Sequence, residues 1–367
     1  MSWEAVTARR LARQGLSAPM DGGPAEVARA MCGAHAQVMS AGELSIGLRL
    51  AGSTRDDIQR AVWTDRTLVK TRGPRGTVHL LPSADLPMWT GALSALPASL
   101  DLLTPDEVEE IVAAIRDALD DSELTVAELT HEVVARTGSW AGDRVLDAFQ
   151  DKWPRWVQAL GVATWRGAVC FGPVRGRAQT YTSPRRWLPG FVPDDAEPAT
   201  RELVRHYLRA YGPATPQHFA RWLGVPVTWA SAEFASAGLE EVEVADQRMW
   251  QLAGDKLPAA TADGVRLLPY FDAYSIAAQP RERIFPGKMW DRALARGQAG
   301  NYPVVLVDGV VAGVWHLRRS GRKATITVEC QPRPRRRAIA NEVARIEAFL
   351  GCKADLVFDT ITVGAHA

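Results

Sequence analysis

The order of helices and strands repeats along this chain, and the repetition limits the possible fold more than any other feature of the sequence. Three times, a set of amphipathic helices is followed by two short β-prone runs that a turn joins. The hairpins recur about every 80–100 residues, a spacing that exceeds solenoid repeats and suits whole small domains. Helix–turn–helix followed by a hairpin is typical of winged-helix units. A generic α+β protein is the alternative.

Capping and turn residues locate the individual elements. Thr125 and Glu128 form a capping box, and the Thr-Pro pairs at 104–105 and 215–216 are typical helix starts. The helices expected on this basis are 3–14, 25–32, 41–51, one from Thr54, one from Thr104-Pro105, 125–138, 142–160, 200–211, 215–224, 226–237 and 336–350. The expected hairpins pair 68–72 with 77–81, 239–244 with 248–252, and 314–319 with 324–329, and Asp308-Gly309 is a further turn.

The repeat divides the chain into four expected parts. Residues 1–100, 101–190 and 191–256 are the three winged helices, and 257–367 is a C-terminal β-hairpin region that packs back on them. The fold class is therefore expected to be α+β. No low-complexity linker separates the parts, which favours close packing.

Composition narrows the class of protein. The chain has 367 residues and four cysteines, none of them spaced as a metal-binding pair. The N-terminus lacks the pattern of a signal peptide, and no apolar run reaches the ~20 residues of a spanning helix. We therefore expect a cytoplasmic monomer with reduced thiols, no metal, no cofactor and no membrane partner.

Positive charge is concentrated locally although the formal net charge is only +1. Arginine supplies nearly all of it, since only six of the 43 basic residues are lysine. The clusters lie at 72–75, 175–186, 318–323 and 333–337. Arg bonds phosphate oxygens in pairs, so each cluster is a candidate DNA contact. GC-rich codon usage is the alternative explanation for the arginine content.

Four segments, in the same order along the chain, resemble the family of AlkZ-like winged-helix DNA glycosylases. They are His35–Ser40 (HAQVMS), Arg75–Leu81 (RGTVHLL), Leu267–Tyr274 (LLPYFDAY) and Val307–Trp315 (VDGVVAGVW). Together these segments extend over almost the whole chain. Each alone is a weak motif, whereas the ordered set is quite specific.

The resemblance implies three tandem winged helices in a C-shape around a DNA-binding channel, with a C-terminal β-hairpin that contacts DNA. It implies cleavage of the N-glycosidic bond of N7-alkylguanine and, in some members, unhooking of interstrand crosslinks made by a DNA-alkylating natural product. The family's catalytic motif is Gln, an apolar residue, then Gln or Asp. Gln37 and Val38 match the first two positions, and Met39 departs from the third.

The chemistry that a glutamine can supply fits such a reaction. N7-alkylation makes the guanine cationic, so it leaves as a neutral base, and the enzyme has mainly to place a water and stabilise an oxocarbenium-like transition state. A glutamine side chain accepts from water and also donates, whereas the Met39 thioether is a poor acceptor. Gln37 would act with a backbone carbonyl or a nearby residue. No lysine lies near this segment, so we expect a monofunctional glycosylase rather than a Schiff-base lyase.

The expected DNA contacts come from two hairpins. They are Arg72, Arg75, His79, Arg318, Arg319, Arg322 and Lys323. His79 has a structural alternative, in which a neighbouring carbonyl satisfies its ring. Asp272 is expected to be structural, capping a helix or pairing with Arg281 or Arg283, with assistance to catalysis as the alternative.

Two non-catalytic classes compete with the enzyme. Gln37 has the alternative role of a helix-flanking residue that bonds backbone, and Met39 favours a protein without activity. One such class is a winged-helix regulator, although the chain has no segment resembling a dimerisation or effector domain. The other is a protein that binds damaged duplex DNA without cutting it.

Overall fold

The structure is a computed structural model that describes residues 1–97, 100–147, 152–256, 261–300, 302–320, 323–330 and 335–363. The chain forms two compact units. The split unit combines Met1–Ala61 with Val204–Ala367, and the central unit is Val62–Leu203. Within the described ranges, no helix is both long and apolar enough to cross a lipid bilayer.

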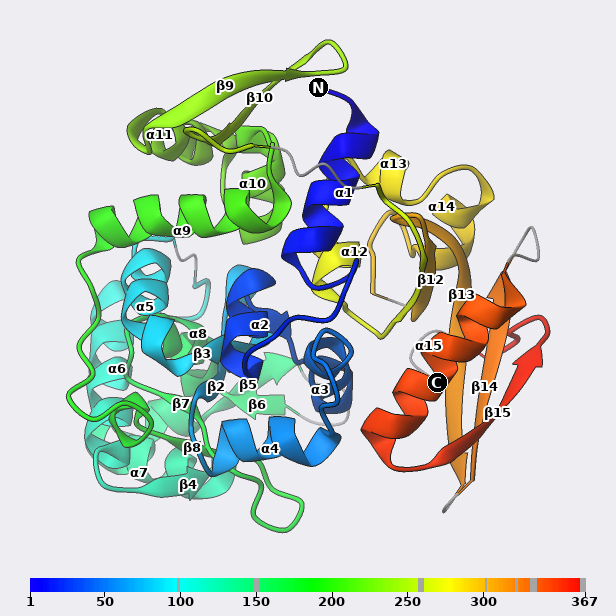
Figure 1. Cartoon of the computed structure of the whole chain (residues 1–367). Helices are drawn as coiled ribbons and strands as arrows, with labels where there is room; N and C mark the ends of the chain where they lie inside the picture. The colour runs from blue at the N-terminus through cyan, green and yellow to red at the C-terminus, as the bar shows by residue number, and fades with distance from the viewer. Residues whose placement is uncertain are drawn as a thin grey trace. The chain divides into compact units, whose positions relative to one another are not determined.

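The split unit is a mixture of helices and antiparallel strands (Figure 1). Its helices are α1 (Trp3–Arg13), α2 (Pro24–Ala30), α3 (Met39–Gly47), α10 (Pro216–Leu223), α11 (Val227–Ser236), α12 (Ala273–Ala277), α13 (Arg281–Ile284), α14 (Lys288–Ala293) and α15 (Arg336–Leu350). Its strands are β1 (Ala34–His35), β9 (Leu239–Val244), β10 (Gln247–Leu252), β11 (Val265–Leu268), β12 (Val304–Val307), β13 (Val310–Ser320), β14 (Lys323–Cys330) and β15 (Lys353–Phe358). The unit boundaries fall within α4 (Arg55–Trp63) and α9 (Ala196–Tyr211).

A five-stranded sheet in the order β11-β12-β13-β14-β15 forms the core of the C-terminal region. Neighbouring strands are antiparallel except β14 and β15, which are parallel. The connection between these two is α15, which packs against β11 and β15 (Figure 1). Along β14 buried residues alternate with half-buried ones, the pattern of a strand with one face on the core.

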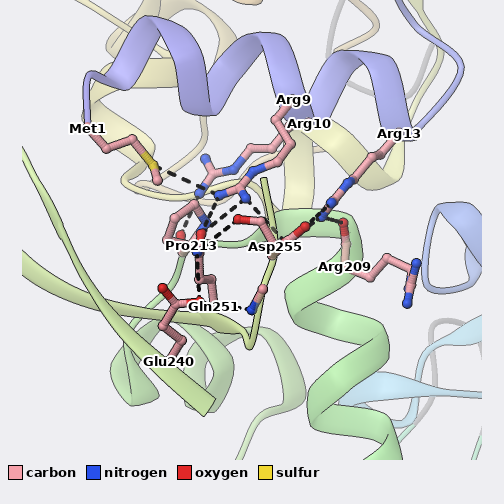
Figure 2. A network of polar contacts seen from close by, with 10 residues as sticks. Met1, Arg9, Arg10, Arg13, Arg209, Pro213, Glu240, Gln251 and Asp255 are labelled. Atoms are coloured by element: carbon pink, nitrogen blue, oxygen red, sulfur yellow. Dashed lines mark hydrogen bonds and ion pairs between the residues drawn. The ribbon is translucent and has the colours of Figure 1, made fainter. Parts of the chain in front are cut away.

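Buried arginines tie α1 to the rest of the split unit. Arg9 and Arg10 belong to the expected amphipathic helix 3–14, and each is only 1% exposed. Arg9 donates to the Gln251 side chain at 3.1 and 3.2 Å and to Asp255 at 3.2 Å, and Arg13 pairs with the same carboxylate (Figure 2). Burial lowers the pKa of Arg9 to about 10, and Asp255 opposes that shift.

The central unit contains the hairpin β2–β3 and a helical layer. Its strands are β2 (Leu68–Arg72), β3 (Val78–Pro82), β4 (Glu123–Thr125), β5 (Arg144–Asp147), β6 (Lys152–Pro154), β7 (Cys170–Phe171) and β8 (Thr180–Thr182). Its helices are α5 (Leu86–Ser94), α6 (Pro105–Leu119), α7 (Val126–Thr137) and α8 (Leu160–Trp165), with short 3-10 turns at Pro74–Gly76, Ser83–Asp85, Ser139–Gly142, Arg155–Ala159 and Pro184–Arg186.

The expected capping box at Thr125 and the expected helix start at Thr104 are confirmed, and one expected helix is wrong. The Thr125 and Thr104 side chains accept from the backbone N–H of Glu128 and Glu107 at 3.3 Å, so the start of α6 also has a capping box, which was not predicted from the sequence. The helix expected over 142–160 is instead the hairpin β5–β6, a 3-10 turn and the start of α8. Pro154 explains the difference, because it removes an N–H and disfavours helical backbone in the residue before it.

The structure bears out the mixed α+β class. The split and central units are defined by how closely residues pack in space. The expected domains were defined by the order of helices and hairpins along the sequence, so the two divisions do not test each other. The division into three winged helices and a C-terminal region therefore stays a prediction.

Candidate functional site

The Gln37–Met39 segment lies at the surface of the split unit. It joins β1 to the start of α3, with Gln37 and Val38 exposed and Met39 half-buried. Val38 is the N-cap residue of α3, and its apolar side chain gives the helix no cap hydrogen bond. The segment is held close to α3, because a Cβ on Gly42 would lie only 2.9 Å from the His35 carbonyl oxygen.

A buried ion pair fixes α3 from its other end. The Arg49 guanidinium donates to both carboxylate oxygens of Asp272 at 2.8 Å, and neither side chain is exposed. The Ser45 hydroxyl donates to the same carboxylate, and Asp272 also caps α12 by accepting from the Tyr274 N–H at 3.0 Å. The expected capping is confirmed, whereas Arg49 rather than Arg281 or Arg283 is the ion-pair partner.

The segment Val307–Trp315, which resembles a family motif, contains a tight turn and makes two hydrogen bonds to other parts of the split unit. Asp308 and Gly309 form the predicted turn, with φ angles of 50° and 81°. The Gly309 carbonyl accepts from the Tyr274 hydroxyl at 2.9 Å, and burial raises the pKa of Tyr274 to about 12, so this donor keeps its proton. Trp315 donates to the Leu268 carbonyl at 2.9 Å. These contacts link the Val307–Trp315 segment to α12 and to β11.

Glu43 is the acidic side chain of α3, and its surroundings exclude it as a base. It is 1% exposed. Its two carboxylate oxygens accept from Arg55 at 2.6 Å and from Gln59 at 3.2 Å. The exposed polar group of the motif is therefore Gln37 itself.

A cavity of about 320 Å³ opens beside the motif, within the split unit. Val38 contributes from the motif, and Ser40, Ala41 and Leu44 contribute one face of α3. The remaining lining residues are Arg55, Pro269, Tyr270, Pro303, Trp315, Leu317, Arg319 and Leu350. The sequence did not predict this cavity, because its walls come from six separate stretches of chain.

The C-terminal hairpin brings one predicted DNA contact to this cavity. Trp315, Leu317 and Arg319 alternate along β13, so they share one face of the strand. Arg318, Arg319 and Lys323 are exposed, and none of the three has an ion pair with another described residue. The register Ser320↔Lys323 places them next to the hairpin tip. Arg322 lies outside the described residues.

The other predicted contacts lie in the central unit. Arg75 is exposed at the turn between β2 and β3, and Arg72 donates to the Gly76 carbonyl at 2.9 Å. His79 is 4% exposed, and its Nδ1 lies 2.9 Å from the Thr77 carbonyl oxygen. This placement fits the structural alternative for His79, and its role as a DNA contact stays a prediction.

Several clustered arginines have carboxylate partners. Arg175 pairs with Glu128 at 3.0 Å and Arg185 with Asp120 at 3.6 Å. In the cluster at 333–337, Arg335 pairs with Asp308 at 2.8 Å. Arg318, Arg319 and Lys323 differ from these, because no acidic side chain among the described residues forms an ion pair with them.

The cysteines and acidic residues provide no metal site among the described residues. No group of three or more His, Cys, Asp or Glu side chains there comes close enough together to hold a metal ion. All four cysteines are free thiols.

Comparisons with known proteins identify the family of this chain. The family model for AlkZ-like DNA glycosylases matches residues 28–349. A curated relative from Streptomyces sahachiroi, named interstrand DNA cross-link repair glycosylase, is 31% identical over 86% of this chain and 88% of its own length. The solved structure of Streptomyces sahachiroi DNA glycosylase AlkZ superposes with a TM-score of 0.83 at 28% identity, covering 98% of this chain and 100% of that one. The chain belongs to the AlkZ-like family and is a DNA glycosylase.

Proposed function

We propose that this DNA glycosylase hydrolyses the N-glycosidic bond of N7-alkylguanine in duplex DNA, acts as a monomer and has no lyase activity. The observation that carries the proposal is the placement of Gln37. It is exposed, it adjoins a cavity, and a wall of the same cavity carries the basic residue Arg319.

Gln37 has the chemistry that this reaction needs. The cationic base leaves as a neutral molecule, so a strong general acid is unnecessary. The Gln37 carbonyl oxygen accepts a hydrogen bond from a water molecule and orients that water toward the sugar, and an amide can also donate through its N–H groups. The lining of the cavity includes no lysine, which fits hydrolysis rather than a Schiff-base route.

Ser40 provides a second polar group at the same place. Met39 cannot orient a water well, but Ser40 is exposed on the first turn of α3 and lines the cavity. Its hydroxyl both donates and accepts. We therefore propose that Ser40 assists Gln37 in holding the nucleophilic water.

DNA binding in this proposal rests on basic side chains of two hairpins. Arg318, Arg319, Arg322 and Lys323 contact phosphates from the C-terminal hairpin, and Arg72 and Arg75 of the hairpin β2–β3 are proposed as further phosphate contacts. Three tandem winged helices in a C-shape, implied by the family resemblance, would supply the channel that holds the duplex.

Crosslinked guanine is the physiological substrate that we propose. Support comes from the Streptomyces sahachiroi relative, which is named for interstrand cross-link repair. Unhooking such a lesion would protect a cell that makes a DNA-alkylating natural product. In this role the protein acts in base excision repair and antibiotic self-resistance.

The test is incubation with a duplex carrying one N7-methylguanine, followed by alkali and detection of strand cleavage at the lesion. Cleavage only after alkali is the expected result, because a monofunctional enzyme leaves an intact abasic strand. Absence of cleavage at protein concentrations that saturate the duplex would refute the proposal.

A damage-binding protein is the second candidate function, and Met39 is the observation that favours it. Binding that depends on the adduct, without release of base, would identify this function. Protection of one defined sequence, independent of damage, would instead identify a regulator.

A further inference from the structure

The cavity beside the motif is apolar over most of its wall. Leu44, Leu317 and Leu350 contribute aliphatic side chains, while Trp315 and Tyr270 contribute aromatic ones. The indole N–H of Trp315 is satisfied by the Leu268 carbonyl at 2.9 Å, so this buried ring brings no unpaired donor to the wall. An apolar group entering the cavity is therefore favoured over water.

The two charged lining residues are arginines. Arg55 is held by its hydrogen bond from Nε to Glu43 at 2.6 Å, and its side chain is 40% exposed. Arg319 is exposed and has no ion pair among the described residues. Arg319 is therefore the lining residue whose charge can pair with a DNA phosphate, while Glu43 partly neutralises Arg55.

The size of the cavity limits what it can hold. A volume of about 320 Å³ is at the lower end of small-molecule pockets, which span roughly 300–1,000 Å³. It suits one aromatic or aliphatic substituent. The walls are preformed, since the ion pair between Arg49 and Asp272 fixes α3 and the strand register fixes β13.

We propose that this cavity is a subsite for the N7 substituent of the adduct, and that it selects guanines bearing an apolar, aromatic N7 group over N7-methylguanine. The inference rests on the proposed function and names its substrate class. Guanine N7 lies on the major-groove edge of the base pair. A substituent there can enter a cavity at the protein surface while its guanine remains stacked.

The experiment compares duplexes carrying N7-methylguanine and N7-benzylguanine with the wild type and with Leu317→Trp, which fills the cavity. The measured quantity is the ratio of the two single-turnover excision rates. We expect wild type to prefer the benzyl adduct and Leu317→Trp to lower the benzyl-to-methyl ratio at least tenfold. Val357→Trp, an exposed residue of β15 in the same sheet, is the matched control and keeps the ratio.

Two results would overturn the subsite. An equal fall of both rates in Leu317→Trp would mean that the cavity holds the guanine itself, and an unchanged ratio would mean that it holds no part of the adduct.

A binding measurement separates failure of the subsite from failure of the proposed function. In the Gln37→Ala background, the Kd values for benzyl and methyl duplexes are compared with and without Leu317→Trp. If the wild type releases neither base, the proposed function fails, yet a preference for the benzyl duplex that Leu317→Trp removes still supports the subsite. Equal Kd values for the two duplexes overturn it.

Discussion

The Arg49 guanidinium and the Asp272 carboxylate face each other through two hydrogen bonds of 2.8 Å, with no solvent exposure of either side chain. The pair joins α3, which follows the Gln37 motif, to the segment that enters α12. Removing one member leaves an uncompensated charge in the interior, which costs far more than the pair contributes as a unit.

Asp272→Ala is therefore expected to lower the free energy of unfolding by about 3–5 kcal/mol. Urea unfolding followed by circular dichroism measures the change. Glu132→Ala breaks the exposed pair between Glu132 and Arg136 on α7 and serves as the control, with an expected loss of about 0.5 kcal/mol. Equal losses for the two variants would contradict the assigned role of Asp272.

Met39→Gln is expected to raise the rate of base excision by about tenfold, because an amide adds an acceptor and donors where the thioether has little of either. Single-turnover excision of N7-methylguanine measures the rate. Met39→Leu, which retains an apolar side chain of similar size, should leave the rate near that of the wild type. A Met39→Gln rate equal to or below that of the wild type would show that a second amide does not assist base excision at this position.

Replacing Arg318, Arg319, Arg322 and Lys323 by Ala is expected to weaken DNA binding and flatten its salt dependence. Each lost phosphate contact lowers the slope of log K against log salt by about 0.9. Fluorescence anisotropy over a salt series gives this slope. Replacing Arg175 and Arg185, which already pair with acids, should change it less. A slope equal to that of the wild type would exclude the hairpin as a phosphate contact.

His218 is expected to make the fold sensitive to acid. Burial, assisted by Arg10 and Arg221, lowers the pKa of His218 from 6.5 to about 4. The unfolded chain therefore takes up a proton at higher pH than the folded one does, so stability falls as pH drops from about 6.5 to about 4. The loss is on the order of 3 kcal/mol for a shift of this size.

The substitution His218→Asn tests whether His218 causes this acid sensitivity. In the wild type, Nδ1 of His218 accepts a hydrogen bond from the Thr215 backbone N–H at 3.3 Å, and the amide oxygen of Asn can accept the same bond without titrating. Thermal unfolding measured between pH 4 and pH 7 should show that this variant loses less stability than the wild type as the pH falls. His131→Asn, at an exposed position of α7, should retain the loss seen in wild type. Parallel pH profiles for wild type and His218→Asn would contradict the prediction.

Local chemistry explains which elements could be predicted from the sequence. The helix start at Thr104-Pro105, the capping box at Thr125 and the Asp308-Gly309 turn determine backbone geometry within a few residues, and all three are confirmed. The 142–160 stretch has helical periodicity, yet Pro154 interrupts it. Strand β15 was missed because helix α15 separates it in sequence from its parallel partner β14. No turn residues mark such a pairing, as they do in a hairpin.

The site was predictable only in part. The Gln37 segment and the basic residues near the C-terminal hairpin tip could be found from sequence, since each is a short contiguous pattern. The cavity could not, because Val38, Tyr270 and Arg319 come together only through tertiary packing. The burial of Arg9 and Arg10 could not be predicted either, since their partners Gln251 and Pro213 lie more than 200 residues away.

The central claim is that Gln37 carries the excision step. Wild type and Gln37→Ala are compared on a duplex with one N7-methylguanine, by strand cleavage after alkali and by anisotropy for affinity, with Gln217→Ala on α10 as the control. We expect Gln37→Ala to lose at least about 100-fold in rate with nearly unchanged Kd, and Gln217→Ala to match the wild type. Excision by Gln37→Ala at the wild-type rate would contradict the account.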